Sequence, residues 1–260
     1  MQVKIYQVDA FALNLFEGNP AAVCPLDEWL PEELLQQIAE ENNLSETAFF
    51  VKEEQEYRLR WFTPEDEVDL CGHATLAAAH VLFQHLGYSN KSVSFYTKSG
   101  ELEVTRDGSN YSMSFPASLP KPVEAPPELI ESLGVTPCIV LAAFDYIVVY
   151  ENEAQVSNIT PDFSLLQKLD LRGVVITAPG NDVDFVSRCF FPKLRVNEDP
   201  VTGSAHCELS PYWSELLNKT TLLGKQLSSR TGEVGCEVVG DRVILSGSAV
   251  DYMEGVITLN

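Results

Sequence analysis

The chain has 260 residues, enough for one large domain or two ordinary ones. Its 45% hydrophobic and 21% charged residues are typical of a folded, soluble protein. A formal net charge of -21 would repel nucleic acid and anionic membrane surfaces, so neither is expected as a partner. A small anionic metabolite stays open as a partner, because it responds to local dipoles and hydrogen-bond donors more than to net charge.

The ends and the cysteines favour a cytoplasmic protein. The opening residues MQVKIYQVDAF read as a strand and lack the charged and apolar regions of a secretory signal. No apolar run approaches the ~20 residues that a membrane-spanning helix needs. Six scattered cysteines, without a C-x-x-C pair or zinc-like spacing, predict reduced and mostly buried thiols.

The first half is predicted to consist of short strands and two helices. Gly and Pro in EGNP (17–20) end the first strand. A helix is expected from Pro31 to Asn43, with acidic residues at the positive end of its dipole. Strands are expected at 3–11, 21–26, 47–52, 57–63, 92–98, 100–106 and 110–116.

The second helix lies in VDLCGHATLAAAHVLFQHLG (68–87) and has no polar face. Nearly every position from Ala74 to Phe83 is small or apolar. A helix that is apolar all round in a soluble protein is buried. The order of elements therefore predicts an α+β domain in which a mainly antiparallel sheet wraps a central helix.

A proline-rich segment divides the chain. PASLPKPVEAPP (116–127) has five prolines and predicts a stiff, extended connection. We place an N-terminal domain at 1–118 and a C-terminal domain at 119–260. The second half repeats the theme weakly, which indicates a duplication. Strands are expected at 138–143, 145–151, 173–179 and 184–191 and in the tail 226–260, with helices at 163–169 and 207–217.

Two turns could carry chemistry, DLCGHAT (69–75) and EDPVTGSAH (198–206). Each places an Asp and a Gly beside the start of a helix. The free N–H groups and partial positive charge of two helix starts could grip a carboxylate or stabilise an enolate-like intermediate. Ordinary N-capping is the alternative interpretation of each turn.

Glu46 in NLSETAFF is the candidate acid or base. It either caps a turn and faces water, or it is held at a cavity wall where apolar neighbours raise its pKa so that it can move a proton. His73 could donate to a substrate or shuttle a proton, or be packed. His80, His85 and His206 are expected to be structural. Nucleophile-elbow and glycine-rich nucleotide motifs are missing, so any chemistry is expected from side chains, without cofactor or metal.

Several of these motifs resemble the PhzF-like family, named for phenazine biosynthesis. The matching segments, in order, are VDAF, GNPAAVCPL, NNLSETAFF, RWFTPEDEVDLCGHATLAAAHVL, EDPVTGSAHCELSPYW, QLSSRTGEV and VILSGSAV. The resemblance covers essentially the whole chain. It implies a fold shared with diaminopimelate epimerase, in which each of two similar domains curls a mainly antiparallel sheet around a central helix and the active site lies in the cleft between domains.

The resemblance also implies a cofactor-independent isomerase. In the family's characterised enzyme a glutamate moves a proton between carbons of dihydro-3-hydroxyanthranilate, and its counterpart here is Glu46. The assisting and positioning residues correspond to His73 and Asp199. The substrate-binding residues correspond to Asn19, Gly72, Gly203 and Ser204. A homodimer is common for folds of this kind.

Two other functions stay open. Related amino-acid epimerases use two cysteines, one at each helix start. Cys71 occupies the first of these positions, but the second turn has Pro200 and Val201 instead, and Cys207 lies further on. A two-thiol mechanism is therefore disfavoured, because both bases must reach one carbon. The other function is that of a metabolite-binding protein that keeps the fold without turnover.

Overall fold

The computed structural model describes residues 1–54 and 56–259, which form two compact units. The first unit comprises Met1–Ser114 and Ser246–Asn260, and the second comprises Phe115–Leu245. The expected domains, 1–118 and 119–260, differ from this division mainly at the C-terminus. The last strand, β17 (Arg242–Thr258), pairs along β1 (Gln2–Ala10), and this returns the tail to the first unit.

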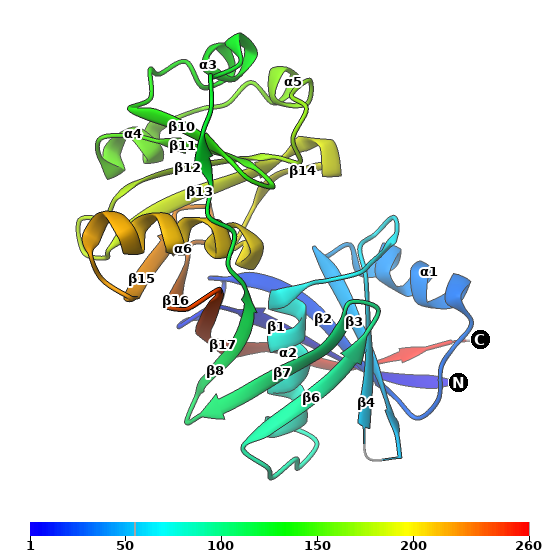
Figure 1. Ribbon diagram of the computed structural model, residues 1–260. Coiled ribbons are helices and arrows are strands. Elements are labelled where there is room, and N and C mark those ends of the chain that lie inside the picture. The colour runs from blue at the N-terminus through cyan, green and yellow to red at the C-terminus, as the bar shows by residue number, and fades with distance from the viewer. Residues whose placement is uncertain (55, 260) are drawn as a thin grey trace. The chain divides into compact units, whose positions relative to one another are not determined.

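The first unit is a barrel closed by hydrogen bonds between strands (Figure 1). Around the ring the order is β1, β2, β3, β4, β6, β7, β8, β17 and back to β1. The β2–β3 and β4–β6 pairs are parallel, whereas β1–β2, β3–β4, β6–β7, β7–β8 and β1–β17 are antiparallel. The strands are β2 (Asn19–Leu26), β3 (Glu46–Glu53), β4 (Glu56–Phe62), β5 (Glu67–Val68), β6 (Ser92–Thr97), β7 (Gly100–Asp107) and β8 (Asn110–Pro116).

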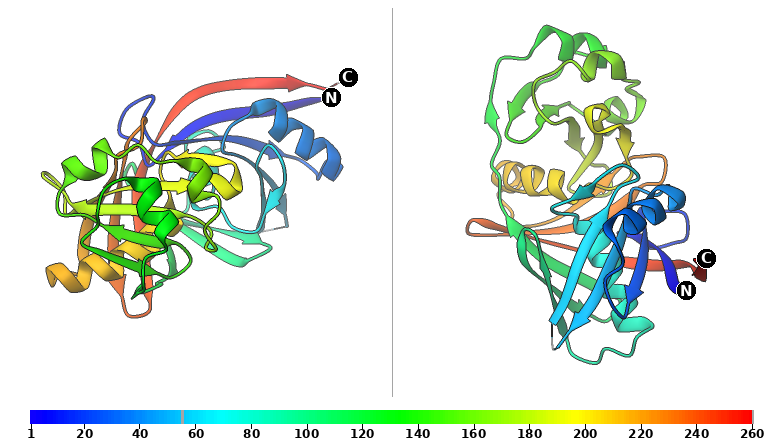
Figure 2. Two further views of the ribbon diagram at one scale, coloured as in Figure 1. Left: turned by 90° about the horizontal axis from the view of Figure 1, so that it is seen from above. Right: turned by 90° about the vertical axis from the view of Figure 1, so that its right-hand side faces the viewer.

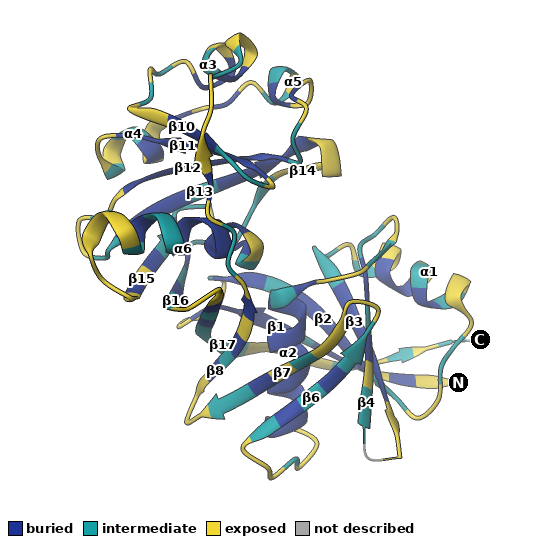
Figure 3. Cartoon of the chain, in the orientation of Figure 1, coloured by how far each residue is buried: buried dark blue, intermediate teal, exposed yellow. Residues whose placement is uncertain are grey.

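Helix α2 (Gly72–Gln84) fills this barrel, as its sequence predicts. Every residue from His73 to Phe83 is buried, and Figure 3 shows most of the helix in the dark blue of buried residues. The helix packs against β1, β2, β3 and β7. The run of alanines allows the surrounding strands to approach closely, so the small apolar residues are the reason that a helix fits inside a ring of this size.

Helix α1 (Glu32–Asn42) covers the outside of the same barrel. Its buried residues Leu35 and Ile38 share an apolar core with Phe49 of β3. Successive residues of a strand face opposite sides, so Glu46, Ala48 and Phe50 face α2 when Phe49 faces α1. Strand β3 is thus buried on both faces, which explains why TAFFV does not alternate with polar residues.

The two chain ends lie together at one end of the barrel (Figure 2). The Met1 ammonium donates to the Leu259 carbonyl oxygen at 2.7 Å, and the Leu259 N–H donates to the Met1 carbonyl oxygen at 2.8 Å. These bonds continue the β1–β17 ladder to its last described residue.

The second unit is also a mainly antiparallel sheet with one long helix. The pairs β9–β10, β10–β11, β12–β13, β13–β14 and β15–β16 are antiparallel, and β11–β12 and β13–β15 are parallel. Its strands are β9 (Lys121–Pro122), β10 (Ile139–Ala142), β11 (Tyr146–Val149), β12 (Val174–Pro179), β13 (Phe185–Phe191), β14 (Val196–Asp199), β15 (Thr221–Gln226) and β16 (Gly232–Val239). Its helices are α3 (Pro127–Leu133), α4 (Glu153–Asn158), α5 (Phe163–Leu166), the 3-10 helix η1 (Pro192–Leu194) and α6 (Gly203–Leu217).

The segment after β8 is tied to α6 through a proline. Pro211 lies inside α6 and has no N–H to offer the Cys207 carbonyl oxygen four residues earlier. The Ser118 N–H donates to that oxygen instead, at 3.0 Å. The Ala117 N–H donates to the Asp241 carbonyl oxygen at 2.8 Å. Residues 115–118 therefore belong to the second unit, although they were expected in the first domain.

Most expected elements are present, and the α+β class with a buried helix is confirmed. The helix expected at 163–169 is the shorter α5, whereas α3 and α4 were not predicted. Within the described residues the six cysteines are free, and only Cys138 is exposed. Among the helices that the structure describes, none has both the length and the apolar character to span a bilayer.

Candidate active site

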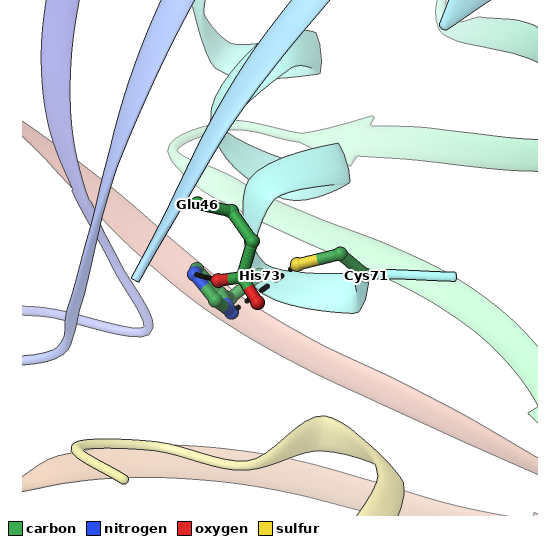
Figure 4. Close-up of side chains that lie close together, drawn as sticks. All are labelled: Glu46, Cys71 and His73. Atoms are coloured by element: carbon green, nitrogen blue, oxygen red, sulfur yellow. Dashed lines mark hydrogen bonds and ion pairs between the residues drawn. The ribbon is translucent and has the colours of Figure 1, made fainter. Parts of the chain in front are cut away.

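Three side chains meet where α2 begins (Figure 4). The Glu46 Oε2 atom lies 3.0 Å from His73 Nε2, and His73 Nδ1 lies 3.5 Å from Cys71 Sγ. The side chains of His73 and Glu46 are 8% and 18% exposed, so the pair is nearly but not fully closed to solvent. The sequence interpretation expected an apolar wall beside the carboxylate, but its nearest neighbour is an imidazole.

The contact between Glu46 and His73 leaves hydrogen-bonding capacity unused. Glu46 Oε2 and His73 Nε2 are both buried, and neither has a well-aligned hydrogen bond to any described residue. Buried polar atoms in folded proteins are nearly always paired. The two atoms lie 3.0 Å apart, so an unused acceptor and an unused ring nitrogen face each other at the start of α2.

The local chain fixes the position of Glu46. Asn43 ends α1 in the left-handed conformation at φ 49°, and the chain then turns into β3. The Asn42 Nδ2 group donates to Thr47 Oγ1 at 3.1 Å, and the Ser45 hydroxyl donates to Asn19 Oδ1 at 3.0 Å. Glu46 is therefore held between two side-chain hydrogen bonds, at the first position of a strand whose ladder with β2 starts at Ala21.

The electrostatics of the cluster favour a charged histidine. Burial alone would lower the pKa of His73, but Cys71 and the Glu46 carboxylate raise it well above its ordinary value. Burial raises the pKa of the Cys71 thiol, and the Glu46 charge raises it further. Both shifts favour the protonated forms, an imidazolium at His73 and a neutral thiol at Cys71.

Gly72 contributes through the backbone. It is the first residue of α2, after Cys71 at the N-cap, and the Thr75 hydroxyl donates to the Cys71 carbonyl oxygen at 2.5 Å. The first N–H groups of a helix have no intrahelical acceptors and attract anions. This helix start therefore places positive potential beside Glu46 and His73.

The same three residues could offer a carboxylate, a thiolate and an imidazole to a metal ion, since their ligand atoms lie within 4.8 Å of one another. A thiol must lose its proton to bind a metal. The raised pKa of Cys71 opposes that loss. The donor set therefore fits proton chemistry better than metal binding.

The second predicted turn precedes α6 in the second unit. Thr202 is its N-cap, and the Thr202 hydroxyl donates to Asp199 Oδ2 at 2.5 Å. The Gln226 side chain binds both ends of the turn. It accepts from the Thr202 N–H at 2.9 Å and donates to the Asp199 carbonyl oxygen at 2.6 Å. Gly203 is the first residue of α6, as Gly72 is of α2.

Ser204 belongs to a charged cluster that the sequence did not reveal. Arg172 Nη2 donates to the Ser204 hydroxyl at 3.0 Å and to Asp145 Oδ2 at 2.5 Å. Glu208, one turn along α6, is fully buried and accepts from the Asp145 N–H at 3.3 Å. No local signal in HCELS distinguishes Glu208 from an exposed helical glutamate. The charged residues of its cluster, Asp145 and Arg172, lie 63 and 36 positions earlier in the sequence.

The structure thus groups the predicted site residues by unit. Glu46 and His73 are in contact, Gly72 is next to His73, and Asn19 is bonded to the residue before Glu46. In the second unit the predicted residues Asp199, Gly203 and Ser204 surround the start of α6.

His206 and Cys207, also in this part of the chain, are structural, as expected for His206. His206 is fully buried, and its Nδ1 lies 2.8 Å from the Thr202 carbonyl oxygen. Burial lowers its pKa to about 4. Burial also raises the pKa of Cys207 to about 12, so the neutral forms of both groups are favoured near neutral pH.

A family model for phenazine biosynthesis-like proteins, PhzC-PhzF, matches residues 8–255. The chain belongs to this family. An uncharacterized isomerase of Pseudomonas aeruginosa is 53% identical over 259 residues, and the match covers 100% of both chains. A phenazine biosynthesis-like domain-containing protein of Homo sapiens is 38% identical, over 99% of this chain and 100% of the relative.

Solved structures agree with this assignment. A PhzF family protein of Enterococcus faecalis has a TM-score of 0.98 at 52% identity, with 100% of both chains covered. A hydroxyproline epimerase of Agrobacterium vitis has a TM-score of 0.60 at 10% identity, covering 98% of this chain and 92% of its own, which is a likeness of fold alone.

Proposed function

We propose that this protein is a cofactor-independent isomerase that moves a proton between carbons of a small cyclic or unsaturated carboxylic acid, of the dihydro-3-hydroxyanthranilate type. The observation that carries the proposal is the contact of Glu46 Oε2 with His73 Nε2 at 3.0 Å, in which both buried atoms lack a well-aligned hydrogen bond. Membership of the PhzC-PhzF family and relatives named as isomerases support it.

Glu46 is the proposed acid and base. As a carboxylate it accepts a proton from one carbon of the substrate, and as the resulting carboxylic acid it returns the proton to another. One shuttling group is enough for a shift on a single face of a ring. The side chain is 18% exposed, which leaves the carboxylate within reach of a ligand.

His73 is proposed to assist by charge. Its raised pKa favours the imidazolium form, which faces the Glu46 carboxyl group. When Glu46 takes up a proton, the imidazolium and the N–H groups at the start of α2 are left to stabilise the negative charge that develops on the substrate. This division of roles needs no group beyond the chain's own side chains and backbone.

The remaining predicted residues are proposed to bind the substrate. Asn19 and Gly72 lie beside Glu46 and His73 in the first unit. We propose that Asp199, Gly203 and Ser204, in the second unit, also take part in recognition of an anionic metabolite. Support comes from the second turn, which repeats the construction of the first: a helix start with glycine at its first position.

An amino-acid epimerase is the second candidate, and the thiols count against it. Two-base epimerisation needs a thiolate on one face of the carbon to take up its proton and a thiol on the other face to deliver one. The pKa of Cys71 is raised by burial and by Glu46, and that of Cys207 is raised to about 12 by burial. Neither sulfur is prepared to act as a base.

The test is turnover of dihydro-3-hydroxyanthranilate and related cyclic acids by the native protein and by Glu46→Gln. The amide cannot accept a proton from carbon, so we expect kcat to fall by about 10²–10⁴-fold with the fold intact. Glu53→Gln, at the opposite and exposed end of β3, is the matched control and should keep native turnover. A Glu46→Gln variant with native turnover would reject the proposed role of this residue.

A further inference from the structure

A second cluster of potential ligands lies away from Glu46, toward the other end of α2. His80 Nε2 and His85 Nε2 each lie 3.0 Å from Oδ1 of Asp251 in β17. The ligand atoms of the three residues all lie within 4.8 Å of one another. His80 is buried, the side chain of His85 is 25% exposed and that of Asp251 is 46% exposed. The cluster is therefore anchored in the core and open to solvent on one side.

The buried histidine has a partner for its other nitrogen. His80 Nδ1 lies 3.0 Å from the Tyr111 hydroxyl, and Gln84 Nε2 donates to the same hydroxyl at 3.4 Å. When Nδ1 donates its proton to Tyr111, the Nε2 atom presents its lone pair toward Asp251. Metal-binding histidines in proteins are almost always held by such a second hydrogen bond.

An irregularity in the barrel sets the position of the carboxylate. The β1–β17 register passes from Gln7 opposite Met253 to Val8 opposite Asp251, so Tyr252 is the extra residue of a bulge. Bulges redirect side chains and are common beside functional sites. Here the extra residue directly follows Asp251 in β17. The Asp251 carboxylate contacts His80 and His85, which lie 171 and 166 positions earlier in the sequence.

From this geometry we propose that His80, His85 and Asp251 bind one divalent transition-metal ion of the zinc type, with the remaining coordination position open to solvent. Two imidazole nitrogens and a carboxylate oxygen are a donor set that zinc sites use, with bonds of about 2.0–2.2 Å. In a tetrahedral site such bonds place neighbouring ligand atoms about 3.3 Å apart. The two nitrogen–oxygen distances of 3.0 Å need to open only slightly to admit the ion.

Another carboxylate lies near the cluster. Tyr6 packs against His85 with ring centroids 4.7 Å apart and ring planes tilted by 32°, and Glu254 is hydrogen-bonded to Tyr6. No Lys or Arg side chain forms an ion pair with Asp251 among the described residues; its ion-pair partners are the two histidines. A bound ion would join the helix inside the barrel to the strand that returns from the second unit.

The test is metal binding by the full chain after treatment with a chelator. Zn²⁺ is titrated against a chromophoric competitor, and Co²⁺ absorption reports the ligand set, since a thiolate ligand adds an intense charge-transfer band. We expect one equivalent of metal per chain, no thiolate band, and a higher melting temperature with Zn²⁺ because the ion binds only the folded state.

Variants assign the site. Asp251→Asn and His85→Asn should each weaken Zn²⁺ binding by at least about 10-fold, and Tyr111→Phe, which removes only the partner of His80, by about 10–100-fold. Cys71→Ser tests the cluster beside Glu46 and should bind normally, as should Asp107→Asn, which changes an exposed carboxylate at the end of β7. Circular dichroism confirms that each variant is folded.

Two results would overturn the proposal. Absence of stoichiometric binding by the native chain would show that Asp251 only bridges the two histidines by hydrogen bonds. Binding that is lost in Cys71→Ser and kept in Asp251→Asn would place the ion at Glu46, Cys71 and His73.

Discussion

Replacing Glu208 by glutamine should make the protein more resistant to alkaline pH. Glu208 is fully buried in α6 beside Asp145. Burial and the Asp145 charge raise its pKa from 4.5 to about 8, although Arg172 opposes the shift. The folded state therefore keeps a proton on Glu208 at neutral pH, whereas the unfolded chain releases it above 4.5.

The size of the effect follows from linkage. A group whose pKa is raised on folding contributes stability that is complete below its unfolded pKa and is lost as the pH rises through its folded pKa. For one proton the free energy of unfolding falls by at most about 1.4 kcal/mol per pH unit between pH 4.5 and about pH 8. From pH 5.5 to pH 7.5 the native protein should thus lose about 2–3 kcal/mol relative to Glu208→Gln.

The assay is urea denaturation of both proteins at several pH values, followed by tryptophan fluorescence and circular dichroism. The unfolding free energy of Glu208→Gln minus that of the native protein should increase as the pH rises, and it should stay constant above about pH 8. Glu215→Gln, on the exposed part of the same helix, is the control and should run parallel to the native protein. A Glu208→Gln difference that does not change with pH would refute the assignment of a protonated Glu208 in the folded state.

Three further variants test other parts of the account. Trp213→Ala should lower the free energy of unfolding, measured in urea, by about 3–5 kcal/mol. The indole is buried, stacks on Phe185 with ring centroids 5.9 Å apart and donates to Thr177 Oγ1 at 3.0 Å. A decrease under about 1 kcal/mol would contradict its place in the core. Under the proposed mechanism Cys71→Ser should keep turnover within a few-fold, whereas abolished turnover would favour the epimerase. His73→Asn should lower kcat by about 10²–10³-fold. The pKa of His73 is raised, so the native enzyme should lose activity at alkaline pH as the imidazolium loses its proton, and the variant should lack this decrease.

The first unit shows which features could be predicted from the sequence. The burial of α2 was predictable, because a helix without a polar face has only one stable location in a soluble protein. The return of β17 to β1 was not, since pairing between strands about 250 residues apart leaves no local pattern. For the same reason the tail was assigned to the second domain.

The sequence indicated which residues belong to the candidate site better than it indicated which side chains surround them. Glu46 was expected against an apolar wall, and its strand neighbours Ala48 and Phe50 are indeed buried. Its carboxylate, however, contacts His73, which lies 27 positions further along the chain. Asp251 beside His80 and Glu208 beside Asp145 were missed for the same physical reason: long-range contacts decide the surroundings of a charge.

The most direct test of the proposed isomerase is hydrogen exchange at carbon. The native protein and Glu46→Gln are incubated with dihydro-3-hydroxyanthranilate in D2O, and the ring hydrogens are followed by NMR. The account predicts that the native protein moves a ring hydrogen to the acceptor carbon, with deuterium there whenever Glu46 exchanges its proton with solvent before returning it, and that the variant does neither. A shifted ring hydrogen in both samples would contradict the role of Glu46. No shifted hydrogen and no deuterium with the native protein, for this acid or for related cyclic acids that bind, would contradict the isomerase and favour a metabolite-binding protein.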